Sequence, residues 1–564
     1  MPVDVGPLRH PVPLVFMRFG LLAAIALLTL LVIILSIWWP GWLWLLIVLV
    51  PLLAIGAFDR NQSRHSLRRN FPLFARFRWL FEVLGPFMRQ YIVEDDLSGK
   101  PYSRMQRALI YARAKGDEDA HPFGTELDVY SGQYELIVHS VAPKDKNTEP
   151  FRVDVGGPQC AKPYSASILN ISAMSFGALG SNAIQALNLG AKRGGFYHDT
   201  GEGSISPYHR KHGGDLVWEI GSGYFGCRQK DGSFDPGMFA EQASTDQVKM
   251  TEIKLSQGAK PGHGGVLPGA KVTPEIAATR HVPAGQDCVS PAYHTAFSTP
   301  REMVEFAANM REWSGGKPVG IKLCVGHAHE VFAIMKAMLD SGILLDFVVV
   351  DGAEGGTGAA PQEFSNSIGM PLREGLILVR NALVGTGLAG KVRLAASGKV
   401  TSAFSLAANY AVGADWCNAA RAFMFSLGCV QSLKCHTGRC PTGVTTQDPT
   451  LQRGLVIEQK ADRVWRFHDN TLATLAEMVA AAGLHHPREF EPYHLHHRTN
   501  TVEIRTIDRL FPYLRENELI DDPDGSPYAT WWRAADPDSF APQTNIAGDR
   551  LAVYAEARAR GQRL

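Results

Sequence analysis

Short apolar runs that end in Gly, Ser or Asp recur from about residue 165 onward, and a segment with helical periodicity follows each of them. Such alternation is typical of a parallel sheet with helices packed outside it, either a barrel or a doubly wound sheet. The candidate strand ends lie at residues 168–172, 195–199, 216–220, 251–255, 319–324, 347–350, 392–396 and 416–419. Eight of them predict an α/β fold of the (β/α)8 TIM barrel type, whose active site is built from the loops after the strands.

The loops after these strands contain the least ordinary stretches of the sequence. They read SAMSFG (172–177), TGEG (200–203), QGAKPG (257–262), DGAEGGTG (351–358), SGK (397–399) and AR (420–421). Glycine-rich loops that open onto helix N-termini after the last two strands are the usual phosphate site of this barrel. One such loop is weak evidence because glycine also ends strands. Their joint placement predicts a cofactor that carries a phosphate.

Three of the eight cysteines lie in the stretch GCVQSLKCHTGRCPTG (428–443), with the spacing C-x5-C-x4-C. Thiolates bind soft metals, and a glycine-rich loop that ends in Cys-Pro is typical of iron–sulfur ligation, so we predict Cys429, Cys435 and Cys440 as ligands. A structural zinc site with His436 as fourth ligand, or three plain buried cysteines, are the alternatives. The other five cysteines are scattered singly, which does not fit a secreted disulfide framework and favours a reducing compartment.

Residues 19–58 contain no charged side chain, and Pro40-Gly41 divides them into two apolar segments. Each segment is long enough to cross a bilayer core, so the sequence predicts an N-terminal transmembrane hairpin of two helices. Tryptophans gather at the turn, as in an interfacial aromatic belt, at positions Trp38, Trp39, Trp42 and Trp44. A signal peptide is disfavoured because the apolar stretch is too long and no small-residue cleavage motif follows it. A helical hairpin buried in a soluble protein is the alternative.

Basic residues flank the hairpin on its outer ends, whereas the turn has no charge. They are Arg9, Arg18, Arg60, Arg64, Arg68 and Arg69. By the positive-inside rule, both termini and the catalytic domain are expected in the cytoplasm, on a two-pass membrane protein. A nucleic-acid partner is not expected, because Lys+Arg 56 balance Asp+Glu 55 and no basic stripe is present.

At several motifs the chain resembles the flavin-binding synthase domain of glutamate synthases, and more closely the membrane-anchored glutamate-synthase-like proteins without a glutaminase domain. Besides the cysteine stretch, the motifs are ISAMSFGALG (171–180), TGEG (200–203), IKLSQGAKPGHGG (253–265), LPGAKVTPEIA (267–277), SPAYH (290–294), GIKL (320–323) and DGAEGGTGAAP (351–361). The resemblance covers roughly residues 150–450 and follows the family's motif order. It implies a barrel that binds FMN and a 3Fe-4S cluster held by Cys429, Cys435 and Cys440.

The resemblance also implies roles for single residues. The FMN-binding set would be Ser172, Ala173, Met174, Gln257, Lys322, Ser397, Gly398, Ala420 and Arg421. The substrate set would be Ser175, Arg280, Gly356 and Gly358, and the catalytic pair Glu202 and Lys260. For three of these residues the alternative is a structural role: Lys322 as a partner of a core carboxylate, Arg280 as a surface helix residue, and Glu202 as a helix cap.

The chain departs from the family pattern at three places. It begins Met1-Pro2-Val3, without the N-terminal cysteine of a glutaminase, so no glutamine hydrolysis is expected. Ser397-Gly398-Lys399 replaces the family's Asp-Gly-Gly, and Tyr293-His294 ends a motif that is richer in histidine elsewhere. The substrate pocket is therefore not necessarily tuned to 2-oxoglutarate.

The resemblance implies an oxidoreductase acting on CH–NH2 donors, which would convert 2-oxoglutarate and ammonia to L-glutamate by reductive amination. No G-x-G-x-x-G fingerprint follows a strand, so electrons would come from an external protein, ferredoxin or a reductase subunit. The alternatives are related amine chemistry such as N-methylglutamate formation, and a non-catalytic electron-transfer or docking subunit. The sequence is also compatible with a homo-oligomer. The expected regions are the hairpin (1–60), a membrane-proximal linker (61–150), the synthase domain (151–450) and a C-terminal helix and tail (451–564).

Overall fold

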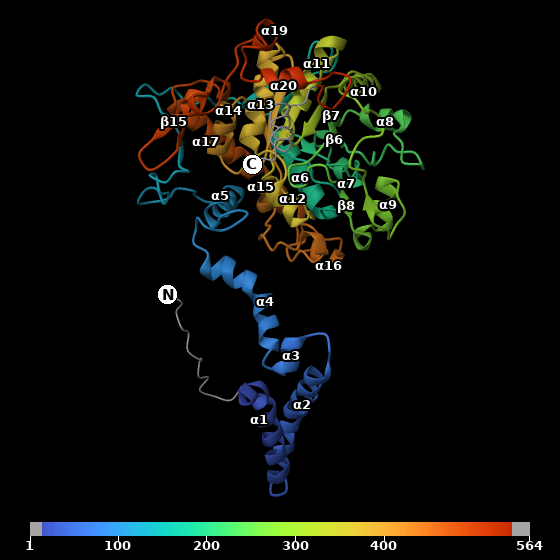
Figure 1. The fold of residues 1–564 in the computed structure, drawn as a ribbon, viewed down its shortest axis with the longest axis vertical. Helices are drawn as coiled ribbons and strands as arrows, with labels where there is room; N and C mark the ends of the chain where they lie inside the picture. The colour runs from blue at the N-terminus through green and yellow to red at the C-terminus, as the bar shows by residue number, and fades with distance from the viewer. Residues whose placement is uncertain (1–13, 544–564) are drawn as a thin grey trace, which may run out of the picture. The chain divides into compact units, whose positions relative to one another are not determined.

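The computed structural model describes residues 14–543. The chain divides into two compact units, one up to Arg104 and one from Met105 onward (Figure 1). The predicted boundary near residue 60 falls inside the first unit, and those near 150 and 450 fall inside the second. Arg9, on which the predicted orientation partly rests, lies outside the described residues, as do the last residues of the predicted tail.

The first unit opens with α1 (Leu14–Leu35), which packs against α2 (Leu46–Asn61). The short helix η1 (Pro40–Leu45) runs directly into α2. Within the described part of the chain, one helical stretch, 40–61, is long and apolar enough to cross a bilayer, and the apolar stretch 19–35 of α1 is shorter. Crossing by both helices therefore stays a prediction.

Three further helices complete the first unit: α3 (Ser66–Asn70), α4 (Arg76–Met88) and η2 (Arg89–Val93). The start of α4 is tied to the end of α2 through Asp59, whose side chain is fully buried. Its carboxylate accepts hydrogen bonds from Nε and Nη2 of Arg76, both at 2.7 Å, and from the amide of Leu73 at 3.2 Å. A bidentate Arg–carboxylate pair fixes both distance and orientation, so these helices turn at a defined place.

The second unit is built on a closed barrel of eight parallel strands. They are β4 (Leu169–Ile171), β5 (His198–Asp199), β6 (Leu216–Ile220), β7 (Val248–Lys254), β10 (Val319–Leu323), β11 (Phe347–Asp351), β12 (Arg393–Ser397) and β13 (Trp416–Ala419). Each overlaps one predicted strand, so the predicted TIM barrel is confirmed. The short apolar runs predicted the strands reliably, because parallel strands are covered on both faces and their sequences are nearly continuous in apolar residues, such as FVVV in β11.

Helices surround the barrel on its outside (Figure 1). In chain order they are α6 (Ser181–Gly194), α7 (Pro207–Arg210), α8 (Pro236–Ala243), α9 (Pro274–Arg280), α10 (Pro300–Trp313), α11 (Ala328–Ser341), α12 (Gln362–Ser367), α13 (Leu372–Gly385), α14 (Ala403–Ala411) and α15 (Arg421–Ser426). The longest insertion follows β7, where a small hairpin of β8 (Val266–Leu267) and β9 (Cys288–Val289) encloses η3 (Gly269–Lys271) and α9. This insertion lies at the end of the barrel where the strands end.

Segments outside the barrel motif cover its flank. The predicted long amphipathic helix is confirmed as α17 (Ile457–Ala481), which packs against α6, α14 and α15. The histidine-rich stretch HLHHR (494–498) has the composition of a solvated loop, but His496 and His497 belong to β14 (Leu495–Arg498). That strand pairs with β1 (Glu135–Ile137) and β15 (Ile504–Thr506), so distant parts of the chain supply its hydrogen bonds.

The remaining elements are short. They are α5 (Arg104–Lys115), the antiparallel pair β2 (Arg152–Val155) and β3 (Tyr164–Ser167), η4 (Cys435–Thr437), α16 (Pro449–Gln452), η5 (Pro487–Glu489), η6 (Pro492–His494), α18 (Ile507–Leu510), α19 (Glu518–Asp521) and α20 (Ala529–Ala534). Of these, α5 and η4 bear directly on the cysteine loop described below.

An ion pair joins the sheet of β1, β14 and β15 to helix α13 of the barrel. Arg373 of α13 forms a two-bond pair with Glu135 of β1, with Nη2 at 2.7 Å from Oε2, and His497 Nδ1 lies 2.8 Å from the same carboxylate. Burial alone would raise the pKa of Glu135, but the bonds from Arg373 and His497 hold it below its ordinary value. The carboxylate is therefore ionised and paired at neutral pH.

We expect Arg373→Met to lower the free energy of unfolding at pH 7 by about 2 kcal/mol, because a charge-assisted contact is lost from a half-buried carboxylate. A carboxyl with a depressed pKa contributes stability above its unfolded pKa, and that contribution is lost as the pH falls through the folded value. The deficit should therefore shrink below about pH 4.5 in urea unfolding curves. Arg505→Met, which removes an exposed pair with Glu503 on the same sheet, is the control and should change little. A deficit that persists at pH 3 would contradict the role of this pair.

Candidate active site and cysteine loop

Glu202 lies in the loop after β5, at the carboxyl end of the barrel. Its carboxylate is 3.2 Å from Nζ of Lys254, and its side chain is 18% exposed. Burial alone would raise the pKa of Glu202, but the charges of Lys254, then Arg280 and Lys260, hold it below its ordinary value. Glu202 is therefore an ionised carboxylate surrounded by three cations.

Gly221 makes room for this carboxylate. A Cβ at Gly221 would lie 2.7 Å from Oε2 of Glu202. A side chain there would displace the carboxylate, so the glycine is needed for close approach.

Arg280 ends α9 and points inward. It is buried, and its Nη2 donates to Oγ of Ser175 at 3.3 Å and to the carbonyl of Phe176 at 3.0 Å. Its Nε has no partner among residues 14–543. The surface-helix alternative for Arg280 is therefore wrong. The predicted substrate residues Arg280 and Ser175 lie together, with a guanidinium donor still free.

Lys260 is also buried, and its ammonium donates to the carbonyl of Gly264 at 2.9 Å. Burial lowers the pKa of Lys260, and the carboxylate of Glu202 opposes that change. The predicted catalytic pair thus shares one electrostatic environment. A buried ammonium beside a carboxylate and a guanidinium is suited to binding a small anion.

The other predicted cofactor residues meet where β4, β11, β12 and β13 end. Oγ of Ser172 lies 3.3 Å from Oγ of Ser397, which donates to Oδ1 of Asp351 at 2.9 Å. The amide of Gly258 donates to Oδ2 of the same aspartate at 2.7 Å. Asp351, to which we assigned no role from the sequence, therefore ties three of the glycine-rich loops together.

Arg421 begins α15 directly after Ala420, and its Nη2 donates to the carbonyl of Glu354 at 2.9 Å. Gly356 lies against the guanidinium, since a Cβ there would be 2.7 Å from Cζ of Arg421. Gly398 follows β12, and a Cβ at this position would lie close to the side chain of Leu372. These loops therefore place Gly356, Gly398, Ala420 and Arg421 at the carboxyl ends of β11, β12 and β13.

The last three predicted positions differ in their surroundings. Met174 is buried in the loop after β4, and a Cβ at Gly201 would lie 3.1 Å from its backbone. Ala173 precedes it in the same loop. Gly358 lies in the loop after β11, and a Cβ at this position would contact no other atom.

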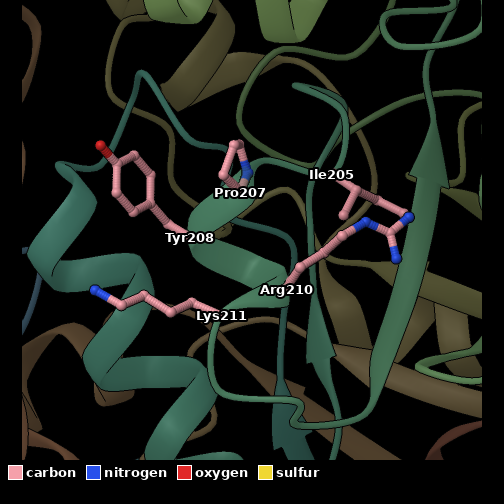
Figure 2. A pocket seen from close by; sticks show the side chains of 5 residues that line it. All are labelled: Ile205, Pro207, Tyr208, Arg210 and Lys211. Atoms are coloured by element: carbon pink, nitrogen blue, oxygen red, sulfur yellow. The ribbon is translucent and has the colours of Figure 1, made fainter.

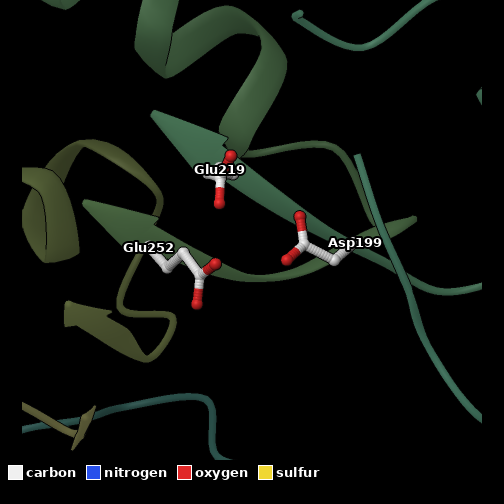
Figure 3. A group of neighbouring side chains, drawn as sticks. All are labelled: Asp199, Glu219 and Glu252. Atoms are coloured by element: carbon white, nitrogen blue, oxygen red, sulfur yellow. The ribbon is translucent and has the colours of Figure 1, made fainter. Parts of the chain in front are cut away.

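Three buried acids, Asp199, Glu219 and Glu252, lie close together (Figure 3), and Lys322 of β10 contacts two of them. It pairs with Glu219 and lies 3.4 Å from Oε1 of Glu252. Burial raises the pKa of Glu252 well above its ordinary value, and Asp199 adds to the rise. The core pairing considered for Lys322 is thus present, while its contact with FMN stays a prediction. The ammonium offsets one negative charge, and the raised pKa of Glu252 favours the protonated form of that acid.

Lys254 is a functional residue that sequence reasoning missed. Its ammonium donates to Oε1 of Gln257 at 2.9 Å and also lies 3.2 Å from Glu202. It therefore orients one predicted FMN residue and one predicted catalytic residue. Strand alternation offered a signal, because Lys254 lies two positions after the inward-facing Glu252 and so shares its side of β7.

The cysteine loop follows α15 and lies against the loop after β4. Nε2 of Gln447 donates to the carbonyls of Gly177 and Leu179, both at 3.0 Å, and the amide of Gly180 donates to the carbonyl of Val444 at 2.9 Å. Tyr111 of α5 donates to the carbonyl of Cys429 at 2.5 Å. The loop is thus held between α5 and the segment that carries Ser172 to Ser175.

The three thiols influence one another, as ligands of one group would. Burial raises the pKa of Cys429 to about 12, and the nearby Cys435 and Cys440 add to the rise. For Cys440, burial is outweighed by hydrogen bonds from Thr442 and Thr445, and its pKa is lowered. A thiol stabilised as thiolate suits a soft metal ligand.

The three cysteine sulfurs are not gathered around one point. Two sulfurs on a tetrahedral zinc lie about 3.8 Å apart. Among the described side chains, the one set of at least three His, Cys, Asp or Glu ligand atoms within 4.8 Å of one another is Asp199, Glu219 and Glu252. The three cysteine sulfurs therefore do not all lie within 4.8 Å of one another, and the cluster stays a prediction.

A separate hollow lies around α7 (Figure 2). It has a volume of about 610 Å³ and is lined by Ile205, Pro207, Tyr208, Arg210 and Lys211. None of the predicted site residues lines it.

The chain is similar to several known proteins. The family model described as the conserved region in glutamate synthase matches residues 152–485. The glutamate synthase large subunit-like protein YerD of Bacillus subtilis is 36% identical over 493 residues, which cover 80% of this chain and 93% of that protein.

Other relatives match over about half of this chain. The archaeal glutamate synthase [NADPH] of Methanocaldococcus jannaschii is 34% identical over 317 residues, 56% of this chain and 58% of that protein. The glutamate synthase [NADPH] large chain of Azospirillum brasilense is 31% identical over 289 residues, 50% of this chain and 18% of that protein. The chain thus spans little more than half of the archaeal protein and under a fifth of the large chain.

Proposed function

Because this chain belongs to the glutamate synthase family, we propose that it is a membrane-anchored FMN and iron–sulfur oxidoreductase that aminates a 2-oxo acid reductively. The favoured reaction converts 2-oxoglutarate and ammonia to L-glutamate. The observation that carries the proposal is the convergence of Glu202, Lys254, Lys260 and Arg280 on one buried site at the carboxyl end of the barrel. This is the side of the barrel on which such enzymes carry out their chemistry.

The residues at the strand ends fit FMN. The serine pair Ser172 and Ser397 and the guanidinium of Arg421 supply hydrogen-bond donors where barrels of this type bind phosphate. Gln257, oriented by Lys254, would contact the ring system. When bound and reduced by the external donor, FMN would supply a hydride, which is one proton with two electrons, to the imine carbon.

Arg280 and Lys260 would hold the carboxylates of the 2-oxo acid, because a planar fork and a compact ammonium suit two separate anionic groups. Glu202, ionised at neutral pH, would take a proton from the nitrogen after ammonia adds to the carbonyl carbon. The same carboxyl would return that proton to the oxygen and would then carry a second proton from the nitrogen to the same oxygen, so that one water departs for each neutral imine formed. These residues also exclude water from the site because they are buried.

The cysteine loop fits a 3Fe-4S cluster, which when bound accepts and donates single electrons. The electrons would come from ferredoxin or a reductase subunit, since the sequence has no dinucleotide fingerprint after a strand. Related amine chemistry such as N-methylglutamate formation would use the same residues. A non-catalytic docking subunit is disfavoured because it would not need the buried cation–carboxylate site.

The first unit would anchor the enzyme as a two-pass membrane protein with a cytoplasmic catalytic domain. The stretch 40–61 is long and apolar enough to span, and Trp38, Trp39 and Trp44 are exposed near the turn. Basic residues that follow α2 favour the cytoplasmic side for everything after it.

Detergent-purified protein tests the proposal. We expect flavin absorption bands, iron and acid-labile sulfide, and an electron paramagnetic resonance signal after oxidation. With dithionite-reduced ferredoxin, 2-oxoglutarate and ammonia should yield glutamate. Protein that binds zinc and no flavin would overturn the proposal, and a preference for methylamine would move it to the related amine chemistry.

We expect Gly356→Ala to fold like the wild type but to bind FMN at least tenfold more weakly. The added methyl would displace the end of a flexible side chain, Arg421, and a charge-assisted bond to a phosphate is worth about 1.5–3 kcal/mol. Fluorescence titration of the apoprotein with FMN measures the dissociation constant. Gly326→Ala, where a Cβ meets nothing within 4 Å, is the control. An unchanged dissociation constant in Gly356→Ala would remove Arg421 from the phosphate site.

A further inference from the structure

Lys271 is a buried lysine that none of the proposed steps uses. It ends η3 in the insertion after β7 and is 6% exposed. Its ammonium donates to the carbonyl of Ala178 at 3.1 Å and to the carbonyl of Cys435 at 3.4 Å. One side chain therefore bridges the loop that carries the predicted flavin and substrate residues and the loop that carries the cysteines.

The two loops are already joined without this lysine. Gln447 bonds to the carbonyls of Gly177 and Leu179, and the amide of Gly180 bonds to Val444. A clamp alone therefore does not explain why a charged group is buried there, since burying an ammonium is costly unless an anion is near. The carbonyls that it contacts are neutral. The ammonium of Lys271 therefore needs an anionic group near it.

The nearby thiols are the available anions. Burial lowers the pKa of Lys271, and the thiols of Cys435 and Cys440 are near enough to oppose that change. Thiolates bound to iron are deprotonated outright, so a bound cluster strengthens this opposition. The lysine therefore has an anionic partner when the proposed metal group is in place.

We propose that Lys271 is a positioning residue whose buried ammonium raises the reduction potential of the iron–sulfur cluster beside the flavin loop. This inference rests on the proposed function, because it requires a cluster on Cys429, Cys435 and Cys440. A fixed positive charge stabilises the state with one more electron, and in a buried place solvent screens it little. Electrons from the external donor are thereby drawn to the cluster and held next to the loop of Ser172 to Ala178.

The test is a redox titration of detergent-purified holoprotein, in which the resonance signal of the oxidised cluster is followed against dithionite. Lys271→Gln keeps a hydrogen-bond donor on a slightly shorter side chain but removes the charge. We expect its equilibrium constant for cluster reduction to fall at least tenfold, which is about 59 mV for a one-electron couple. Lys271→Arg keeps the charge and should stay within about threefold of the wild type by the same relation.

Lys391→Gln, which removes an exposed lysine, is the matched control and should leave the potential unchanged. The proposal is overturned if Lys271→Gln retains its iron and sulfide with the wild-type potential, or if Lys271→Arg shifts as far as Lys271→Gln. If Lys271→Gln loses the cluster, retention by Lys271→Arg supports the need for charge, and loss from both overturns it. Wild-type protein without iron and sulfide would instead overturn the proposed cluster itself.

Discussion

Glu202→Gln should lower kcat by about a hundredfold to ten-thousandfold, the usual contribution of a positioned acid–base group. The amide has nearly the shape of the carboxylate, so it fits between Lys254 and Gly221 without moving either. It cannot accept a proton, so imine formation should fail while FMN stays bound. Steady-state glutamate formation and the flavin absorbance of the same preparation measure the two outcomes.

Glu305→Gln, an exposed glutamate on α10, is the matched control and should keep its turnover. In the wild type, the depressed pKa of Glu202 means that its base form is lost only as the pH falls below about 4.5, the ordinary glutamate range. Turnover should therefore show no acid limb from this group between pH 6 and 8. Unchanged kcat in Glu202→Gln would remove the residue from the mechanism, and loss of FMN would make its role structural.

The barrel could be predicted from the sequence because each strand is short, apolar and followed by a polar loop. The pattern at Phe347–Asp351 shows why: four buried residues end in Asp351, whose side chain then joins three loops. Periodicity gives the strand, but the partners of Asp351 lie on other strands. The role of that aspartate therefore depends on closure of the barrel, which no local pattern contains.

The sequence predicted which residues form the candidate site, but it did not predict the charges that surround each of them. The motifs named Glu202, Lys260 and Arg280, and the fold brings them together. Lys254 shares its side of β7 with Glu252, but that alternation does not show that its partners are Glu202 and Gln257, which lie in the loops after β5 and β7. Similarly, HLHHR has the composition of a loop, and it becomes β14 only because β1, more than 350 residues earlier in the chain, supplies its hydrogen bonds. Long-range pairing of this kind overrides local propensity.

Lys322→Met should lower the free energy of unfolding by about 3–5 kcal/mol, the usual cost of removing one partner of a buried ion pair. Methionine fills a similar volume, but it leaves Glu219 and Glu252 beside Asp199 without a cation inside the barrel. The loss should exceed that of any exposed lysine, and Lys230→Met is the control. Urea unfolding followed by circular dichroism measures the difference.

The pH dependence of this deficit distinguishes charge from packing. Without the ammonium, the acids raise their folded pKa values further, so the folded state binds more protons than the unfolded state and stability falls as the pH rises. The deficit should thus grow from pH 5 to pH 8, and a deficit independent of pH would point to lost packing. Adding Glu219→Gln to Lys322→Met removes one of the uncompensated charges and should restore part of the stability. If that double variant folds well but binds FMN weakly, Lys322 acts on the flavin as well as on the acids. If it binds FMN as tightly as the wild type, the lysine serves the barrel core alone.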